Sequence, residues 1–152
     1  MFGWRGKLLR VDLTTGAIRD EVLDQQTAKD YIGGRGLGIY YLNKEVDPTI
    51  EPLAPANIIV MATGTLTGTR TPTGARYMIM TKSPLTGAIT CSNSGGKFPT
   101  ELKRAGYDAI IFSGRAKAPV YLWVDCKKAE LRSAEHLWGK NTHETTDLLL
   151  AE

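Results

Sequence analysis

The sequence has few cysteines, no long apolar run and little excess charge, and each shortage excludes a class of protein. Its two cysteines, Cys91 and Cys126, lie far apart without Cys-x-x-Cys spacing, which offers neither a zinc site nor an iron–sulfur ligand set and predicts reduced thiols. No run approaches the roughly 20 apolar residues of a membrane helix, and the opening residues lack the apolar core of a signal peptide, which predicts a cytoplasmic protein. The 19 Lys and Arg against 16 Asp and Glu leave a charge of only +3, too even to suggest binding to nucleic acid or to an anionic membrane.

A catalytic set of side chains is also missing. The sequence yields no Ser/His/Asp combination, no pair of carboxylates at a predicted cleft and no cluster of metal ligands. The two histidines, His136 and His143, fall in a short segment and in the first turn of a predicted helix, where such residues are usually exposed. The sequence therefore predicts a protein that holds a ligand and supplies no acid, base or nucleophile of its own.

With 152 residues, of which 42% are hydrophobic, the chain is long enough for one domain with a genuine core and too short for a second domain. Short apolar runs predict strands in pairs with helices between them, which is typical of an α+β fold and not of a doubly wound sheet. The predicted strands are residues 7–12, 17–22, 58–61, 77–80, 88–91, 109–112, 120–124 and 130–132, and the predicted helices begin near residues 25, 37, 98 and 142. The unbroken apolar runs 58–61 and 77–80 predict strands covered on both faces. The last helix, with Asn141 and Glu144 at its start, breaks off within an apolar stretch, so we expect the domain to continue.

The first segment with the composition of a ligand site is the glycine cluster at residues 33–38, Gly-Gly-Arg-Gly-Leu-Gly. It lies before a predicted helix, so its bare N–H groups and the positive end of the helix dipole suit a phosphate. It fails the Gly-x-Gly-x-x-Gly fingerprint of dinucleotide-binding proteins, because Ile39 stands where the third glycine belongs and a helix precedes it. An equally supported alternative is that the glycines let two helices meet at a sharp angle.

Two later loops have the same character. Residues 64–74 are rich in small hydroxyl side chains, lack the Gly-Lys-Ser/Thr of a nucleotide phosphate loop, and lead to Arg76, whose guanidinium can bind a phosphate through two parallel hydrogen bonds. Residues 92–96, Ser-Asn-Ser-Gly-Gly, leave a predicted strand and enter a helix, where asparagine and exposed N–H groups suit an anion or a metal-bound carbonyl. The alternatives are a solvated strand end at Arg76 and a helix cap with a tight turn at Asn93.

Taken in order, these segments resemble the N-terminal domain of the aldehyde:ferredoxin oxidoreductase family over essentially the whole chain. The residues that carry the resemblance are 33–37, 72–77, 81–87, 93–96, 101–103 and 105–110, and the ordered set is specific although no single segment is. The resemblance implies a fold of paired mixed or antiparallel sheets with a few helices. This fold forms a platform for two pyranopterin-dithiolene cofactors, as tungstopterin or molybdopterin, that hold one metal atom. Residues 1–152 would then be an amino-terminal pterin-cofactor-binding domain, incomplete at its C-terminal end.

The resemblance also implies cofactor contacts at particular residues. Arg76, Asn93 and Gly95 match cofactor-contacting positions. The carbonyl of Asn93 matches the position that meets a magnesium ion bridging the two pterin phosphates. These matches agree with the composition of the loops, because Mg²⁺ and arginine are the groups that paired phosphates need. The weaker candidates for the same site are Ser92, Ser94 and Arg35.

For the whole protein, the resemblance implies oxidation of aldehydes to carboxylic acids, with electrons passing through a 4Fe-4S cluster to ferredoxin or a related carrier. The cluster ligands and the substrate pocket are expected after residue 152, so the fragment alone is predicted to be inactive. The choice between tungsten and molybdenum, the substrate and the oligomeric state, including a homodimer, stay open. Two alternatives also stay open: a non-catalytic domain that binds another phosphate-bearing ligand, and an interaction module whose glycines serve turns only.

Overall fold

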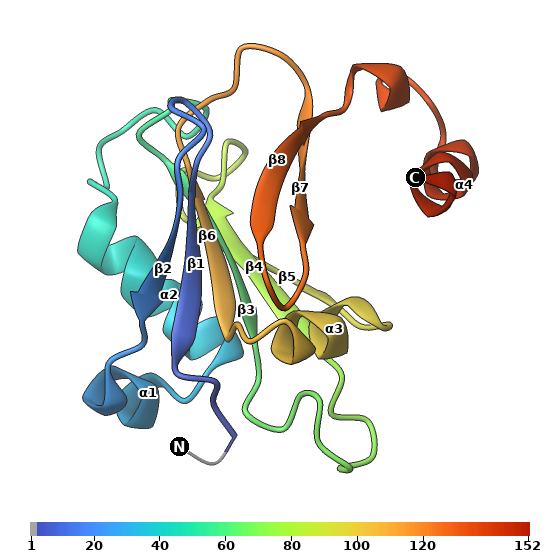
Figure 1. Ribbon diagram of the computed structural model, residues 1–152. Coiled ribbons are helices and arrows are strands. Elements are labelled where there is room, and N and C mark those ends of the chain that lie inside the picture. The colour runs from blue at the N-terminus through green and yellow to red at the C-terminus, as the bar shows by residue number, and fades with distance from the viewer. Residues whose placement is uncertain (1–2) are drawn as a thin grey trace.

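Residues 3–152 are described by a computed structural model, in which a six-stranded sheet has helices on one face and a helix with a two-stranded hairpin on the other (Figure 1). The strands are β1 (Lys7–Asp12), β2 (Ile18–Val22), β3 (Ile58–Thr63), β4 (Tyr77–Lys82), β5 (Ile89–Ser94), β6 (Ala109–Ser113), β7 (Val120–Val124) and β8 (Ala129–Ser133). The helices are α1 (Gln25–Tyr31), α2 (Gly34–Glu45), α3 (Phe98–Arg104), the short 3₁₀ helix η1 (Glu135–Leu137) and α4 (Thr142–Ala151).

The larger sheet is mixed. Its strand order is β2-β1-β6-β3-β4-β5, with β1 and β6 parallel and every other neighbouring pair antiparallel. A parallel pair needs a crossover connection, and here the crossover includes α1, α2, β3, β4, β5 and α3. Strands β7 and β8 form a separate antiparallel hairpin. These sheets and helices confirm the predicted α+β class with mixed and antiparallel sheets.

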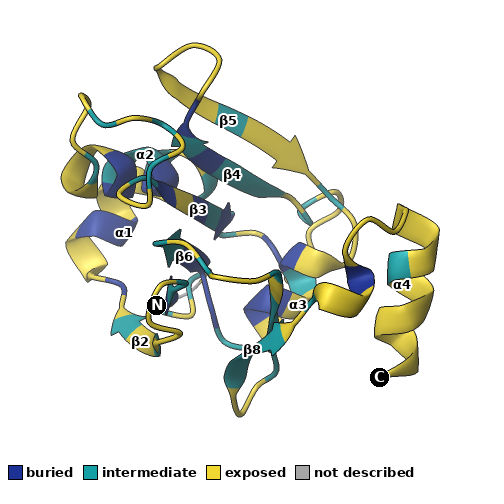
Figure 2. Ribbon diagram, turned by 90° about the horizontal axis from the view of Figure 1, so that it is seen from above, coloured by how far each residue is buried: buried dark blue, intermediate teal, exposed yellow. Residues whose placement is uncertain are grey.

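Two apolar cores lie on the two faces of the larger sheet. On one face α1 and α2 pack against the strands around Leu8, Leu37 and Val60, which are at most 1% exposed. On the other face α3 and the β7–β8 hairpin pack over β1 and β6, around Leu9 and Ile110. Helix α3 and the hairpin do not extend over the outer strand β5, as Figure 2 shows, and five of the six residues of β5 are exposed.

Two strand predictions therefore need correction. The expectation that the strands at 58–61 and 77–80 are covered on both faces is wrong, because Ile59 is 44% exposed and four of the six residues of β4 are only half-buried. The physical reason is that α3 and the β7–β8 hairpin pack over β1 and β6 and stop short of the outer strands. The strand predicted to end at residue 91 continues as β5, because its pairing with β4 runs on as far as Tyr77 opposite Ser94.

The glycine cluster also differs from its prediction, because Gly33 caps α2 and the rest of the cluster lies inside it, so that the helix begins three residues before Leu37. A Cβ atom at Gly36 would lie 2.3 Å from the carbonyl oxygen of Tyr31, and one at Gly38 would lie 1.6 Å from Cε of Met80. Helix α2 thus approaches α1 and β4 too closely for side chains at these positions. Gly36 and Gly38 thus have a packing role, which agrees with the alternative in which the glycines serve the meeting of two helices.

Local signals for turns and helix starts are confirmed. Gly16, in the β1–β2 turn, has a φ of +75°, in the left-handed region that favours glycine. The Asp24 carboxylate caps α1 by accepting a hydrogen bond of 2.8 Å from the Thr27 backbone N–H. Asn141 and Glu144 form a reciprocal capping box at the start of α4, with bonds of 2.9 and 3.1 Å. Within residues 3–152, none of the helices combines the length and the apolar character that crossing a bilayer requires.

Candidate functional site

Three of the predicted site residues come together where β4 begins and β5 ends. Arg76 immediately precedes β4, and Asn93 pairs with Met78 in the β4–β5 ladder. The Arg76 guanidinium donates a hydrogen bond of 2.7 Å from Nη1 to Oδ1 of Asn93. A Cβ atom at Gly95 would lie 3.5 Å from the carbonyl oxygen of Ala75 and 3.8 Å from Cδ of Arg76, so the glycine keeps the space beside the arginine open. The register of two strands thus brings Arg76 beside Asn93, which lies 17 positions further along the chain.

The alternation of side chains along β5 separates the weaker candidates from this group. Asn93 shares the face of its partner Met78, which packs against the core beneath α2. Ser92 and Ser94 lie on the opposite face, as does Ile79, the partner of Ser92. The serine side chains therefore point away from the Arg76 guanidinium, although their backbone flanks Asn93.

Arg35 lies in the first turn of α2, on the same side of the sheet as the Arg76–Asn93 pair. The neighbouring Gly34 brings the helix start close to β4, since a Cβ atom there would lie 3.6 Å from Cγ of Met78. The Arg35 side chain is exposed, and within residues 3–152 no hydrogen bond joins it to Arg76 or Asn93. The structure places Arg35 on the same side of the sheet as the pair without a hydrogen bond to either residue.

The loop between β3 and β4 fixes the backbone of Arg76. Thr67 is 4% exposed, and its hydroxyl lies 3.0 Å from the carbonyl oxygen of Gly74 and 3.1 Å from that of Arg76, so it donates to these two acceptors. Thr69 donates to the Leu66 carbonyl over 2.7 Å and closes the other half of the loop. The small hydroxyl residues predicted to face a ligand are used in part to shape this loop.

The Arg76–Asn93 pair orients donors and contributes little to stability. Both residues are exposed, and an exposed hydrogen bond of this kind is worth about 1 kcal/mol at most. A guanidinium carries five N–H donors, and among residues 3–152 Arg76 makes this one side-chain hydrogen bond and no salt bridge. Its remaining donors and its positive charge are available to an anion, for which a planar bidentate fork is well suited.

Groups for acid–base or metal chemistry are not gathered here. Within residues 3–152 there is no group of three or more His, Cys, Asp or Glu side chains that could hold a metal ion. The two cysteines are unpaired thiols, Cys91 half-buried in β5 and Cys126 exposed in the β7–β8 turn. The free donors and the positive charge of Arg76 are of the kind that suit an anionic group.

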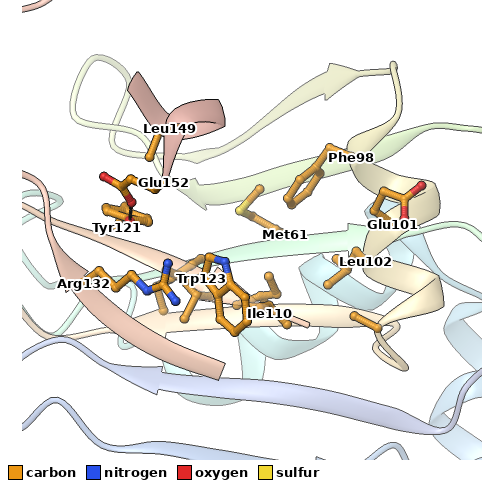
Figure 3. A pocket seen from close by; sticks show the side chains of 14 residues that line it. Met61, Phe98, Glu101, Leu102, Ile110, Tyr121, Trp123, Arg132, Leu149 and Glu152 are labelled. Carbon is orange, nitrogen blue, oxygen red and sulfur yellow. Dashed lines mark hydrogen bonds between the residues drawn. The ribbon is translucent and has the colours of Figure 1, made fainter. Parts of the chain in front are cut away.

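A cavity of about 640 Å³, which no sequence pattern predicts, lies on the opposite face of the sheet (Figure 3). Apolar side chains from β3, α3 and the hairpin line it, among them Met61, Phe98 and Trp123. At its edge Tyr121 donates a hydrogen bond to Glu152, which lowers the pKa of that carboxyl and raises the pKa of the tyrosine. Local apolar patterns predict the strands and the helix that line this cavity, but the way these elements pack together depends on contacts between distant parts of the chain.

Comparisons with known proteins extend over this whole arrangement. The chain is 53% identical, over its full length, to a tungsten-containing aldehyde ferredoxin oxidoreductase of Pyrococcus abyssi. It is 39% identical to the WOR-like subunit of an aliphatic sulfonate oxidoreductase of Pyrococcus furiosus, again over its full length. The solved structure of the active-site complex BamBC of benzoyl coenzyme A reductase with 1,5-dienoyl-CoA matches 99% of the chain, with a TM-score of 0.96 and 38% identity.

The chain spans about a quarter of the length of each of these relatives, 25%, 24% and 23% respectively. The family profile described as "Aldehyde ferredoxin oxidoreductase, N-terminal domain" matches residues 8–152. On this match and on the identity to its relatives, the chain belongs to the aldehyde ferredoxin oxidoreductase family and represents its N-terminal domain.

Proposed function

We propose that this domain is the cofactor platform of a tungsten- or molybdenum-containing oxidoreductase, with Arg76, Asn93 and Gly95 in contact with a tungstopterin or molybdopterin. The observation that carries the proposal is the exposed Arg76–Asn93 hydrogen bond beside Gly95. The bond orients the remaining donors of Arg76, which has no acidic partner in residues 3–152. The name of the Pyrococcus abyssi relative, which contains tungsten, supports the same assignment.

The residues at the site fit the anionic part of a pterin cofactor. A phosphate accepts hydrogen bonds from the free edge of the Arg76 guanidinium, and the bare Gly95 leaves room for it beside the arginine. We further propose that the Asn93 carbonyl would hold a magnesium ion beside the cofactor phosphates, since Mg²⁺ prefers oxygen ligands. Ser92 and Ser94 would contribute backbone groups, and Arg35 long-range positive charge.

The chain's own residues bind and orient the cofactor. When bound, a metal–dithiolene cofactor supplies the redox chemistry, and the protein supplies position and electrostatics. The relatives named for aldehyde ferredoxin, aliphatic sulfonate and benzoyl coenzyme A chemistry all share this domain at 38% to 53% identity. Because relatives named for different substrates share this domain, their likeness supports a role for the domain in holding the cofactor and not in selecting the substrate.

For the full-length protein we propose oxidation of an aldehyde to a carboxylic acid. Electrons would leave through a 4Fe-4S cluster, bound by parts of the protein outside this domain, to ferredoxin or a related carrier. The name of the Pyrococcus abyssi relative supports both the substrate class and the acceptor. The domain alone would be inactive, because the cluster and the substrate pocket lie outside it.

The test is metal analysis of the full-length protein, purified without oxygen from cells supplied with both metals. Inductively coupled plasma mass spectrometry should find tungsten or molybdenum in the wild type and a large loss in the Arg76→Ala, Asn93→Ala double variant. Arg70→Ala is the matched control, because Arg70 is an exposed arginine in the same loop, and it should keep the metal. A metal-free wild type, or undiminished metal in the double variant, would contradict the proposal. In the metal-free case, binding of an ordinary nucleotide would favour a non-catalytic phosphate-ligand domain.

A further inference from the structure

The N-terminal strap, residues 3–6, runs between three segments that lead to the candidate site. Trp4 donates a hydrogen bond of 2.6 Å from Nε1 to the carbonyl oxygen of Ile32, just before α2. Gly3 lies against the β3–β4 loop, since a Cβ atom there would be 3.2 Å from the Thr65 carbonyl oxygen. Arg5 donates from Nε to the Lys103 carbonyl in α3 over 2.7 Å. The strap therefore contacts the segment before α2, the β3–β4 loop that leads to Arg76, and α3.

A buried ion pair holds this strap in place. Lys103 is 4% exposed and Asp108 is 1% exposed, and their charged groups form a salt bridge. The Lys103 ammonium also donates to the Gly3 carbonyl over 3.0 Å. The two oxygens of Asp108 accept from the backbone N–H groups of Arg5, at 3.0 Å, and Gly6, at 2.7 Å.

The same two residues also contact the beginning of the β3–β4 loop, here through atoms other than their charged groups. Thr63, the last residue of β3, donates from its backbone N–H and from its hydroxyl to the main-chain carbonyl of Asp108, each over 2.9 Å. Gly68, within the loop, approaches the lysine so closely that a Cβ atom there would lie 3.3 Å from Cβ of Lys103. The charged groups thus join the strap to α3, and the side-chain stem of Lys103 packs against the loop that ends at Arg76.

A buried ion pair is an inefficient source of stability, because the cost of removing two charges from water offsets their attraction, and apolar replacements of similar volume often match it. Its directional bonds instead define one arrangement of the segments that it joins. We propose that Lys103 and Asp108 are positioning residues for the cofactor site, and this rests on the proposed function. They hold the β3–β4 loop against α3, so that Arg76 meets Asn93 in the geometry that grips the cofactor phosphate.

The test compares variants of the full-length protein. Asp108→Asn removes one charge, and a Lys103→Met, Asp108→Leu double variant removes both charges while keeping bulk. Lys82→Met is the matched control: Lys82 is also buried, at 9% exposure, but its ammonium donates to the carbonyls of Pro48 and Ile50, in the connection between α2 and β3. Each variant is measured for tungsten and molybdenum per folded protein and for melting temperature.

We expect the metal content per folded protein to fall by about tenfold in Asp108→Asn and in the double variant. This is the size of effect expected when groups that orient a metal site are lost. Lys82→Met should lower the melting temperature but keep the full metal content. Wild-type metal content in the folded Asp108→Asn or double variant would overturn the proposal, whatever the change in melting temperature. A wild type without either metal would instead contradict the cofactor role itself, so the two failures are distinguishable.

Hydrogen exchange on the wild type tests the proposal even if both variants fail to fold. The backbone N–H groups of Arg5 and Gly6, bonded to the buried carboxylate, should exchange slowly and in step with those of residues 63–76. Free exchange at Arg5 and Gly6 beside a protected loop would show that the pair does not couple the strap to the loop, and would overturn the proposal.

Discussion

The Arg76 guanidinium donates from Nη1 to Oδ1 of Asn93 over 2.7 Å. Arg76 lies just before β4 and Asn93 lies in β5, so the bond joins the two arms of the β4–β5 hairpin. This contact fixes the plane of the guanidinium and leaves most of its donors free among the described residues. Its geometry matters more than its charge, because a planar fork can bind two phosphate oxygens at once whereas an ammonium cannot.

Arg76→Lys should therefore lose cofactor while keeping the fold. We expect the retained metal in the full-length protein to fall by about tenfold, which corresponds to about 1.4 kcal/mol of binding free energy. The melting temperature should stay unchanged, because the side chain is exposed. Metal analysis and calorimetry measure the two effects. Arg70→Lys, in the same exposed loop, should change neither, and equal metal in both variants would rule out a phosphate fork at Arg76.

The close approach of α2 to α1 makes a second prediction. Gly36→Ala should destabilise the protein by roughly 1–3 kcal/mol or more, because the new Cβ atom would meet the Tyr31 carbonyl oxygen, a backbone atom that cannot move aside. Gly38→Ala should cost less, since the atom in its way is the flexible end of Met80. Urea unfolding ranks the two variants. Gly64→Ala, whose Cβ would make only an ordinary contact of 3.6 Å, serves as the control, and an equal effect at all three positions would refute the steric explanation.

The Thr67 hydroxyl gives a third prediction, about the loop that carries Arg76. Thr67→Val keeps the shape of the side chain but removes the O–H that lies 3.0 Å from the Gly74 carbonyl oxygen and 3.1 Å from that of Arg76. We expect a loss of about 1 kcal/mol in unfolding free energy and a lower metal content. Thr67→Ser keeps the donor and should retain the metal. If valine and serine behave alike, the hydroxyl does not fix the loop.

The fourth prediction concerns pH. The Lys7 ammonium, 2.9 Å from Asp20, and then the Tyr107 hydroxyl hold the pKa of the Asp20 carboxyl below its ordinary value. A depressed carboxyl pKa contributes stability that is present above the ordinary value near 3.8 and is lost as the pH falls through the lowered, folded-state pKa. The pair is largely exposed, so this contribution should be at most about 1 kcal/mol.

Lys7→Met should accordingly unfold at a lower temperature than the wild type at pH 7, and the difference should shrink as the pH falls below 3.8. Calorimetry across this range measures it, and adding salt should reduce the difference at pH 7. A difference that is constant down to the lowest pH would mean that the lysine acts through packing and not through Asp20.

Sequence patterns predict the features of the fold that depend on residues close together along the chain. The cap at Asp24, the capping box at Asn141 and the turn at Gly16 rest on contacts between residues at most four positions apart, and the structure confirms all three. The resemblance to a family singled out Arg76 and Asn93 before any geometry was known, and the register of β4 and β5 brings these two together.

Contacts between distant parts of the chain could not be predicted in this way. The start of α2 was misplaced because Gly36 inside a helix is unfavourable on local grounds and is required only by the Tyr31 carbonyl packed against it. The strap is held by Lys103 and Asp108, about 100 positions away, and no spacing in the sequence signals such a contact.

The central claim is that a pterin cofactor is held at Arg76, Asn93 and Gly95. The most direct test is a crystal structure of the full-length protein, with anomalous diffraction recorded at the tungsten and molybdenum absorption edges to locate the metal. The account predicts a metal-bearing pterin whose phosphate contacts the Arg76 guanidinium, with Asn93 and Gly95 against the same cofactor. A cofactor bound elsewhere in the protein, with these three residues making no contact to it, would contradict the account.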